Sequence, residues 1–340
     1  MRITRQSLIR VAKETAQERA YNNPDIVAAY LAGSLLREEP MLGGTTDIDL
    51  VFVHDQPVRT RREIIKLTPD FHIDIQRRSR EEFKSPRELR GDPWLGHELY
   101  DPMLLFEREK FFEFVQASLR AGFEFESPPL ILQRSRALQS QARDIWLTLS
   151  EGEDKPAQQR VVDYFQAVYL AANSMVELNG APIAERRLLL DYPERIQILE
   201  KPELFGDLLG LLGASQVTPE TIDQRLPEWE AAFITASQAD GTDPRIHPAR
   251  LNYYANAIKS MLSADTPIAA LWPLIQTWAL AAASLSGEQL QIWRTAFGDL
   301  ELIGSSFAQR LQGLDHFLDE IDIVLDAYAV AYGLEKETRI

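Results

Sequence analysis

Every strand-like segment of this 340-residue chain lies in its first third. Ile26–Ala32 and residues 48–53 are apolar and β-branched, and residues 71–75 alternate apolar and polar side chains with the period of two that is typical of a strand. Residues 103–106 are a fourth short candidate. After Ser127-Pro128-Pro129 only helical periodicity remains. We therefore expect an α+β domain of α/β-like character with a small mixed sheet, followed by an all-α helical domain.

Helical patterns flank the strands and fill the second part of the chain. Apolar residues at steps of three or four after Thr4, an expected N-cap, predict a first helix that ends before Asn22-Asn23-Pro24. Other helices are predicted at 107–119, at 130–149, ahead of Gly180, and at 250–262, 268–285, 287–297 and 307–332. We place the boundary near residue 127, which predicts domains 1–126 and 127–340. The second is the more acidic, with 17 basic and 29 acidic residues against 19 and 22 in the first.

Composition limits the classes of function. Apolar residues make up 45% of the chain and charged residues 26%, as in ordinary soluble globular proteins. The net charge of −15 argues against long nucleic acid or an anionic membrane as partner. No cysteine is present, which excludes disulfides and thiolate chemistry. No apolar run approaches the roughly 20 residues of a membrane span, and the N-terminus has no signal-peptide core, so we expect a cytoplasmic protein.

A pair of acidic residues, Asp47 and Asp49, lies on the second predicted strand. Alternate side chains of a strand point to the same face, so the two carboxylates share one location while Ile48 and Leu50 point to the core. Like charges that close are unfavourable on a half-buried strand unless a divalent cation neutralises them. Oxygen ligands without cysteine favour Mg²⁺ or Mn²⁺ over Zn²⁺.

Two further features complete this pattern. Gly33-Ser34 follows the first strand, where a glycine allows close approach of the backbone to a phosphate, and N–H groups and a hydroxyl can bind the phosphate oxygens. On the third strand, Asp74 lies between Ile73 and Ile75 and so faces the other way from both. Asp74 is therefore a natural third carboxylate for the same metal cluster.

Taken together, these residues resemble the nucleotidyltransferase superfamily of DNA polymerase beta. The pattern of that superfamily is Gly-Ser, a spacer of about a dozen residues, Asp-x-Asp on a strand and one carboxylate on the next strand. Within it, the short spacer and a helical C-terminal domain resemble the aminoglycoside and minimal nucleotidyltransferases. The resemblance covers roughly residues 26–78 and implies that Gly33 and Ser34 hold the nucleotide triphosphate. It also implies that Asp47 and Asp49 bind Mg²⁺ and that Asp74 is the third ligand or the general base. The Arg-Gly pair common after the serine is missing, with Arg37 and Gly43-Gly44 as its nearest equivalents.

The resemblance implies an enzyme that moves a nucleoside monophosphate, AMP from ATP or the equivalent from another NTP, to a hydroxyl and releases pyrophosphate. The acidity of the chain suits a cationic acceptor such as an aminoglycoside. Two alternatives stay open, namely nucleotidylation of a protein side chain, and a non-catalytic nucleotide-binding protein of the antitoxin or interaction type. The three intact carboxylates weigh against an inactive enzyme. The identity of the acceptor and the oligomeric state do not follow from the sequence.

Other polar and aromatic residues have a structural interpretation that is at least as good. Three arginines that follow the third strand could bind a triphosphate or form a solvated surface patch. Three histidines, and two carboxylates ahead of the fourth strand, are typical of strand ends and loops. Three tryptophans are typical of a helical core. These residues are Arg77, Arg78 and Arg80; His54, His72 and His97; Glu98 and Asp101; and Trp272, Trp278 and Trp293.

Overall fold

The computed structural model describes residues 3–123, 127–152 and 155–334. It divides into two compact units. The first contains the described residues up to 123 together with Ala249–Ser260, and the second contains the described residues of 127–248 and those from Met261 onward. The domains 1–126 and 127–340 stay a prediction. The sequence pattern had not indicated that Ala249–Ser260 belongs with the first unit.

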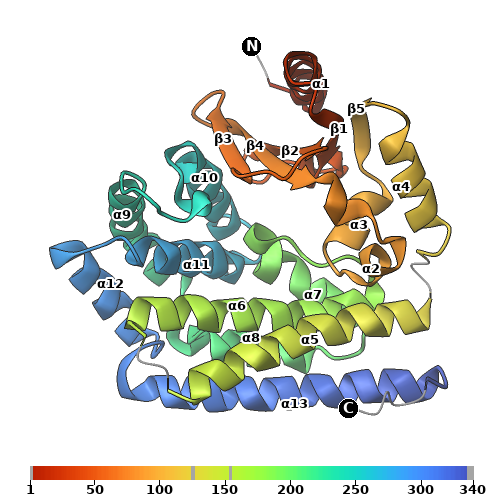
Figure 1. Ribbon diagram of the computed structural model, residues 1–340. Helices are drawn as coiled ribbons and strands as arrows, with labels where there is room; N and C mark the ends of the chain where they lie inside the picture. Colours follow the sequence, from red (N-terminus) through yellow and green to blue (C-terminus); the bar gives the residue numbers. More distant parts are fainter. Residues whose placement is uncertain (1–2, 124–126, 153–154, 335–340) are drawn as a thin grey trace. The chain divides into compact units, whose positions relative to one another are not determined.

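A five-stranded mixed sheet forms the centre of the first unit (Figure 1). Its spatial order is β3-β4-β2-β1-β5. The central pair β2 and β4 is parallel, and every other neighbouring pair is antiparallel. The strands are β1 (Ile26–Ala32), β2 (Thr46–His54), β3 (Arg62–Lys66), β4 (Phe71–Ser79) and β5 (Met103–Glu107). The small mixed sheet expected from the sequence is therefore confirmed.

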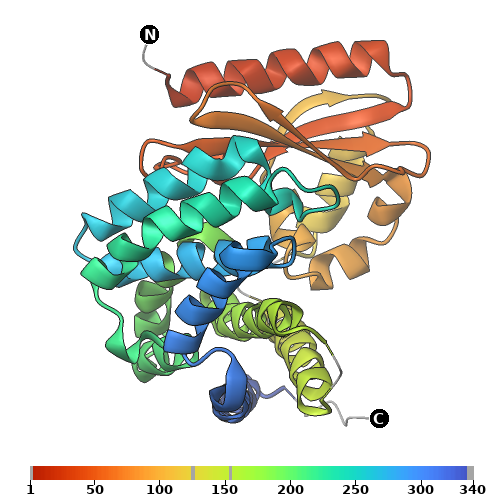
Figure 2. The same cartoon turned by 90° about the vertical axis from the view of Figure 1, so that its left-hand side faces the viewer.

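Helices cover both faces of this sheet (Figure 2). On one face lies α1 (Arg5–Asn22), whose alanines and Leu8 pack against the strands and whose N-cap is Thr4, as predicted. On the other face a second core forms under three short helices, α2 (Pro86–Gly91), α3 (Leu95–Tyr100) and α4 (Phe111–Arg120). Strand β2 is buried on both faces because each of them meets one of these cores.

The second unit is helical in all its described regular elements. Long helices α5, α6 and α13 run side by side in it (Figure 1). The predicted core tryptophans Trp272, Trp278 and Trp293 are buried there. The helices are α5 (Pro128–Ser150), α6 (Ala157–Val176), α7 (Leu188–Ile198), α8 (Glu203–Leu211), α9 (Pro219–Ala236), α11 (Leu271–Ala282), α12 (Gly287–Asp299) and α13 (Phe307–Ala331). The fold class, an α+β region followed by a helical one, is confirmed.

One local prediction was wrong, and one strand had not been predicted. The helix expected from residue 107 begins only at Phe111, because Glu107 ends β5 and Glu109 and Lys110 adopt positive φ angles of 55° and 56°, which interrupt helical geometry. The carboxylate of Glu107 instead accepts hydrogen bonds from the backbone N–H groups of the first helical turn, at 3.1 Å from the nitrogen of Phe112. The edge strand β3 was missed.

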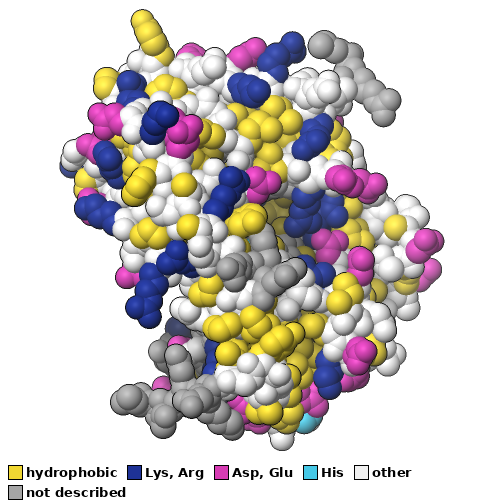
Figure 3. Space-filling view, turned by 90° about the vertical axis from the view of Figure 1, so that its right-hand side faces the viewer, with side chains coloured by type: hydrophobic (Ala, Val, Ile, Leu, Met, Phe, Trp, Pro, Cys, Tyr) yellow, Lys and Arg dark blue, Asp and Glu magenta, His cyan; other side chains and the backbone are white. Residues whose placement is uncertain are grey.

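No described helix combines the length and the apolar character that a bilayer span requires. On the face of the molecule shown in Figure 3, basic and acidic side chains are interspersed with apolar ones instead of grouped by sign. The described side chains on that face form no broad basic surface of the kind that tracks a nucleic-acid backbone.

Candidate functional site

Three carboxylates meet where the parallel strands β2 and β4 run side by side. Asp49 is in register with Asp74, and Asp47 precedes Asp49 by two residues, so all three side chains lie on one face of the sheet. One oxygen atom from each carboxyl group lies within 4.8 Å of those of the other two. The predicted convergence of Asp47, Asp49 and Asp74 is therefore confirmed.

The burial of this cluster makes its charge expensive. Asp74 is completely buried, Asp47 is only 6% exposed, and Asp49 is partly exposed. A buried carboxylate needs a cation or hydrogen-bond donors to stay ionised. Three carboxylate oxygens at this spacing are the donor set that a hard divalent cation such as Mg²⁺ or Mn²⁺ accepts, so the residues fit such an ion.

The pKa of Asp49 reflects this crowding. Burial raises it well above the usual value for an aspartate, and the negative charges of Asp47 and Asp74 raise it further. The positive charges of Arg250 and Arg62 lower it in part. A cation bound beside Asp49 would oppose this rise in its pKa.

The turn after β1 is shaped to the same cluster. Gly33 has a φ of 74° and a ψ of −157°, a backbone region that is open almost only to glycine. A Cβ atom added to Gly33 would lie 1.9 Å from Oδ2 of Asp49, so the backbone touches the carboxylate directly. The hydroxyl of Ser34 lies 2.8 Å from Oγ1 of Thr46 and donates to Oδ1 of Asp47 at 3.4 Å. Arg5 of α1 donates to the carbonyl of Leu35 and so fixes the turn.

Two arginines that the sequence did not single out contact Asp74. Arg62 of β3 donates through Nε to Oδ1 of Asp74 at 2.9 Å, and its Nη2 donates to Oδ2. Arg250, which is 176 positions further along the chain, also donates through Nη2 to Oδ2 of Asp74. The side chain of Arg250 is only 5% exposed, against 33% for Arg62. Burial lowers the pKa of each guanidinium, but the negative charge of Asp74 contributes to a net rise in both.

Arg250 reaches Asp74 because the helix that follows it, most of which belongs to the first unit, packs beside the sheet. Helix α10 (Leu251–Leu262) directly follows Arg250, and its Asn252 donates to Oδ1 of Asp70 at 3.1 Å. The ring of Tyr253 meets that of His72 edge to face, with centroids 5.3 Å apart. The backbone of Gly43, in the spacer between Ser34 and Asp47, lies so close to Asn256 that an added Cβ would be 2.1 Å from the Asn256 carbonyl oxygen.

The remaining sequence candidates have structural contacts outside the cluster. Arg77 pairs with Glu63, Arg78 with Glu98 at 3.1 Å and Arg80 with Asp55 at 3.0 Å. The other two carboxylates also have partners: Glu98 accepts a hydrogen bond from the hydroxyl of Tyr30, and Asp101 pairs with Arg120. Of the histidines, His54 lies with its Nδ1 2.8 Å from Asp25, and the ring of His97 packs against that of Phe123. His72 packs beside Tyr253, as described above.

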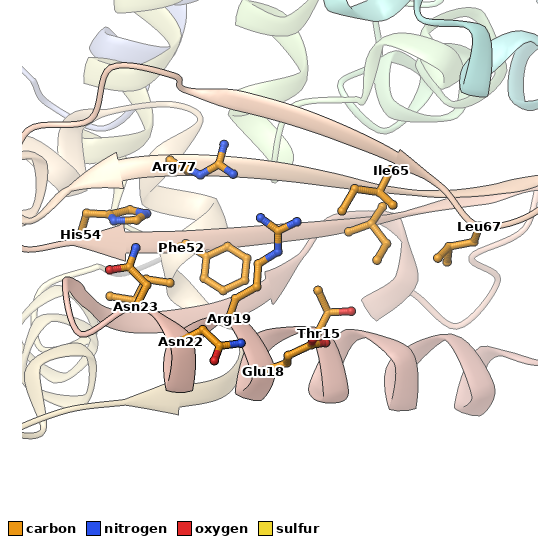
Figure 4. A pocket seen from close by; sticks show the side chains of 12 residues that line it. Thr15, Glu18, Arg19, Asn22, Asn23, Phe52, His54, Ile65, Leu67 and Arg77 are labelled. Carbon is orange, nitrogen blue, oxygen red and sulfur yellow. The ribbon is translucent and has the colours of Figure 1, made fainter.

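A cavity of about 460 Å³ lies on the opposite face of the sheet, between the strands and α1 (Figure 4). Figure 4 shows Arg19 and Arg77 with their guanidinium groups in the same space, near Phe52. Both guanidiniums contact the carboxylate of Glu63. The cavity contains none of the three clustered carboxylates, because Phe52 on β2 alternates in direction with Asp47 and Asp49.

Neither a protein-family model nor a curated protein sequence matches this chain. Among solved structures, the chain is similar to a nucleotidyltransferase-like protein from Exiguobacterium sibiricum 255-15, with 14% sequence identity and a TM-score of 0.33. The alignment covers 98% of this chain and 97% of that one. At this TM-score the likeness carries no functional argument, so any assignment rests on the geometry of the site.

Proposed function

We propose that this protein is a metal-dependent nucleotidyltransferase that moves a nucleoside monophosphate, AMP from ATP, to a hydroxyl group. The observation that carries this proposal is the convergence of Asp47, Asp49 and Asp74 within 4.8 Å on two neighbouring strands. A turn that contacts Asp49 through Gly33 supports it. Carboxylates placed together in this way suit phosphate chemistry assisted by a divalent cation.

The residues have distinct roles in this proposal. Asp47, Asp49 and Asp74 hold the cation, Mg²⁺ or Mn²⁺, which when bound neutralises charge on the phosphate oxygens. The backbone N–H groups of the turn at Gly33 and the hydroxyl of Ser34 bind the triphosphate of the nucleotide. A carboxylate of the cluster accepts the proton of the attacking hydroxyl.

The reaction balances as an in-line displacement. The acceptor oxygen forms a bond to the α-phosphorus, the bond from that phosphorus to the bridging oxygen of the β-phosphate breaks, and pyrophosphate leaves. The acceptor proton passes to the carboxylate and from there to solvent. No redox partner is needed.

The acceptor that we favour is a small cationic molecule with hydroxyl groups, such as an aminoglycoside. The net charge of −15 attracts a cation over long range and repels long polyanions. We further infer that the protein works in the cytoplasm, where ATP and Mg²⁺ are abundant. A hydroxyl of a protein side chain is the alternative acceptor.

One observation favours a second candidate, a non-catalytic nucleotide-binding protein of the interaction type. Asp74 is engaged by two guanidinium groups, which neutralise a carboxylate without any metal ion. A protein of this kind would bind nucleotide and transfer nothing.

A labelled transfer screen tests the proposal. The purified protein is incubated with ATP labelled at the α-phosphorus, Mg²⁺ or Mn²⁺, and aminoglycosides, other hydroxyl compounds or protein acceptors. We expect the label to appear on one acceptor class with release of pyrophosphate, and Asp47→Ala and Asp49→Ala to lower turnover by several orders of magnitude while the fold is kept.

Asp55→Ala is the matched control, because Asp55 follows the end of the same strand β2 and pairs with Arg80, and both side chains are exposed. It should retain full turnover. Labelling that persists in Asp49→Ala would place the chemistry elsewhere. Nucleotide binding without any transfer across the screen would support the non-catalytic candidate instead.

A further inference from the structure

The cluster around Asp74 already contains cations that belong to the chain. Three carboxylates converge, and two guanidinium groups, those of Arg62 and Arg250, contact Asp74. With all three carboxylates ionised, the group of five side chains therefore carries one net negative charge instead of three. A free divalent ion entering it gains the attraction of the carboxylates but is also repelled by two positive charges a few ångströms away.

The Arg250 side chain keeps a donor that Asp74 does not use. Its Nε is buried and has no hydrogen-bond partner among the described residues, while its Nη2 donates to Asp74. A buried guanidinium with a spare N–H can donate a hydrogen bond to a second anionic group and keep its hydrogen bond to Asp74. Phosphate oxygens brought beside the cluster would meet that need.

Hydrogen bonds also hold the helix that follows Arg250 beside the sheet. The carboxylate of Asp70 accepts hydrogen bonds from Asn252 and Asn256 in the helix that follows Arg250, at 3.1 and 3.3 Å. The hydroxyl of Thr45 donates to the carbonyl of Tyr253 at 3.3 Å. Because its backbone is held at the sheet, the positive charge stays next to the metal ligands.

We propose that Arg250, together with Arg62, makes the carboxylate cluster selective for a divalent metal–nucleoside triphosphate complex over the free metal ion. The proposal rests on the function proposed above. The free ion is opposed by both guanidiniums, whereas the complex delivers phosphate oxygens that offset the repulsion and pair with them. Arg250 is in this sense a specificity-determining residue for what enters the site.

Metal-binding measurements without turnover test this. Binding of Mn²⁺ alone is measured from the decrease in the electron paramagnetic resonance signal of the free ion. Binding of α,β-methylene-ATP together with Mn²⁺ is measured by calorimetry. Arg250→Gln removes the charge and keeps a polar side chain. We expect this variant to bind Mn²⁺ alone about tenfold more tightly, and the Mn²⁺–nucleotide complex about tenfold more weakly, than the wild type.

Arg77→Gln is the matched control, because Arg77 is on the same strand β4 as Asp74 but points to the opposite face and pairs with Glu63. It should leave both affinities unchanged. Arg62→Gln is measured in parallel. Arg62 is partly exposed, so its substitution is better tolerated by the fold. If circular dichroism shows that Arg250→Gln does not fold, Arg62→Gln should show the same tighter binding of Mn²⁺ alone and weaker binding of the Mn²⁺–nucleotide complex.

A purely structural role for Arg250 would weaken both affinities together. The proposed selectivity is wrong if folded Arg250→Gln binds Mn²⁺ alone no more tightly than the wild type does. If Arg250→Gln does not fold, the same result in Arg62→Gln has this meaning. Either result leaves the metal centre in place. Absence of Mn²⁺ binding in the wild type, with and without nucleotide, would remove the metal centre itself and with it the proposed function.

Discussion

At the scale of single residues, the negative charge of Asp49 is unfavourable in the folded, metal-free protein. Its carboxyl group is crowded by Asp47 and Asp74 and partly removed from water, and both effects raise its pKa. An acid whose pKa is higher in the folded than in the unfolded chain stabilises the fold only while it is protonated. The contribution of Asp49 to the stability of the metal-free protein should therefore fall as the pH rises from about 4 through its folded pKa.

We predict that Asp49→Asn raises the melting temperature of the metal-free protein at pH 7. The amide removes the repulsion between buried carboxylates, and in a domain of 150–250 residues each kcal/mol gained is worth about 2–4 °C. The gain should shrink toward pH 4, where the wild-type Asp49 is protonated as well. Melting curves at several pH values, with chelator present, measure it.

The same variant should lose the response to metal. Mg²⁺ should raise the melting temperature of the wild type and leave that of Asp49→Asn almost unchanged, since binding to the folded state stabilises it by mass action. A variant that melts below the wild type at pH 7 in chelator would contradict the crowding argument.

The carboxylates were predictable from the sequence, and their arginine partners were not. Asp47 and Asp49 are two residues apart on one strand, and Asp74 is flanked by two isoleucines, so strand periodicity alone orients all three. Arg250 lies among Pro, Ala and Leu in a helical region, and nothing local connects it with Asp74. Contacts between such distant positions depend on tertiary packing, which a single sequence does not encode in a readable pattern.

At the scale of elements, the central strands were found and the edge strand was not. Strand β2 is an apolar run because both of its faces are buried, whereas β3 has half-exposed residues and begins and ends with Arg62 and Lys66. Charged, short edge strands give a weak periodic signal. Because Arg62 lies on β3, its contact with Asp74 could not be predicted without that strand.

The spacer after Ser34 also has a function at this scale. Gly43 has a φ of 61°, and a Cβ there would meet the carbonyl oxygen and carbon of Asn256 at 2.1 and 2.4 Å. These are backbone atoms of α10, which cannot rotate away as a side chain would. The spacer therefore helps to set where α10, and with it Arg250, lies against the sheet.

We predict that Gly43→Ala loosens the packing of α10 against the sheet of the first unit. Hydrogen exchange followed by mass spectrometry should show faster exchange in residues 249–260, with α4 unchanged. Gly44→Ala is the matched control, since Gly44 also has a positive φ, of 73°, but a Cβ there meets no atom within 4 Å. Equal exchange in the two variants would show that only backbone strain, and not the contact with Asn256, matters.

At the scale of the whole molecule, the formal charge is unevenly divided along the chain. The net charge is −15, and residues 127–340 hold 29 of the 51 acidic side chains but only 17 of the 36 basic ones. Several of these acids form ion pairs with arginines, as Asp315 and Asp319 do with Arg143. The excess that is left repels polyanions and attracts cations over distances comparable to the Debye length.

We therefore predict that the apparent affinity for a polycationic acceptor weakens when salt is raised from about 0.05 to 0.5 M, because the Debye length drops from roughly 14 to 4 Å. KM for the acceptor, measured over this range in the transfer assay, should rise, while kcat changes little because the short-range contacts at Asp47, Asp49 and Asp74 are screened less. A neutral polyol acceptor, if it is a substrate, provides the control and should show a flat KM. A KM for the polycation that is equally flat would rule out long-range steering by the acidic chain and favour a neutral or protein acceptor.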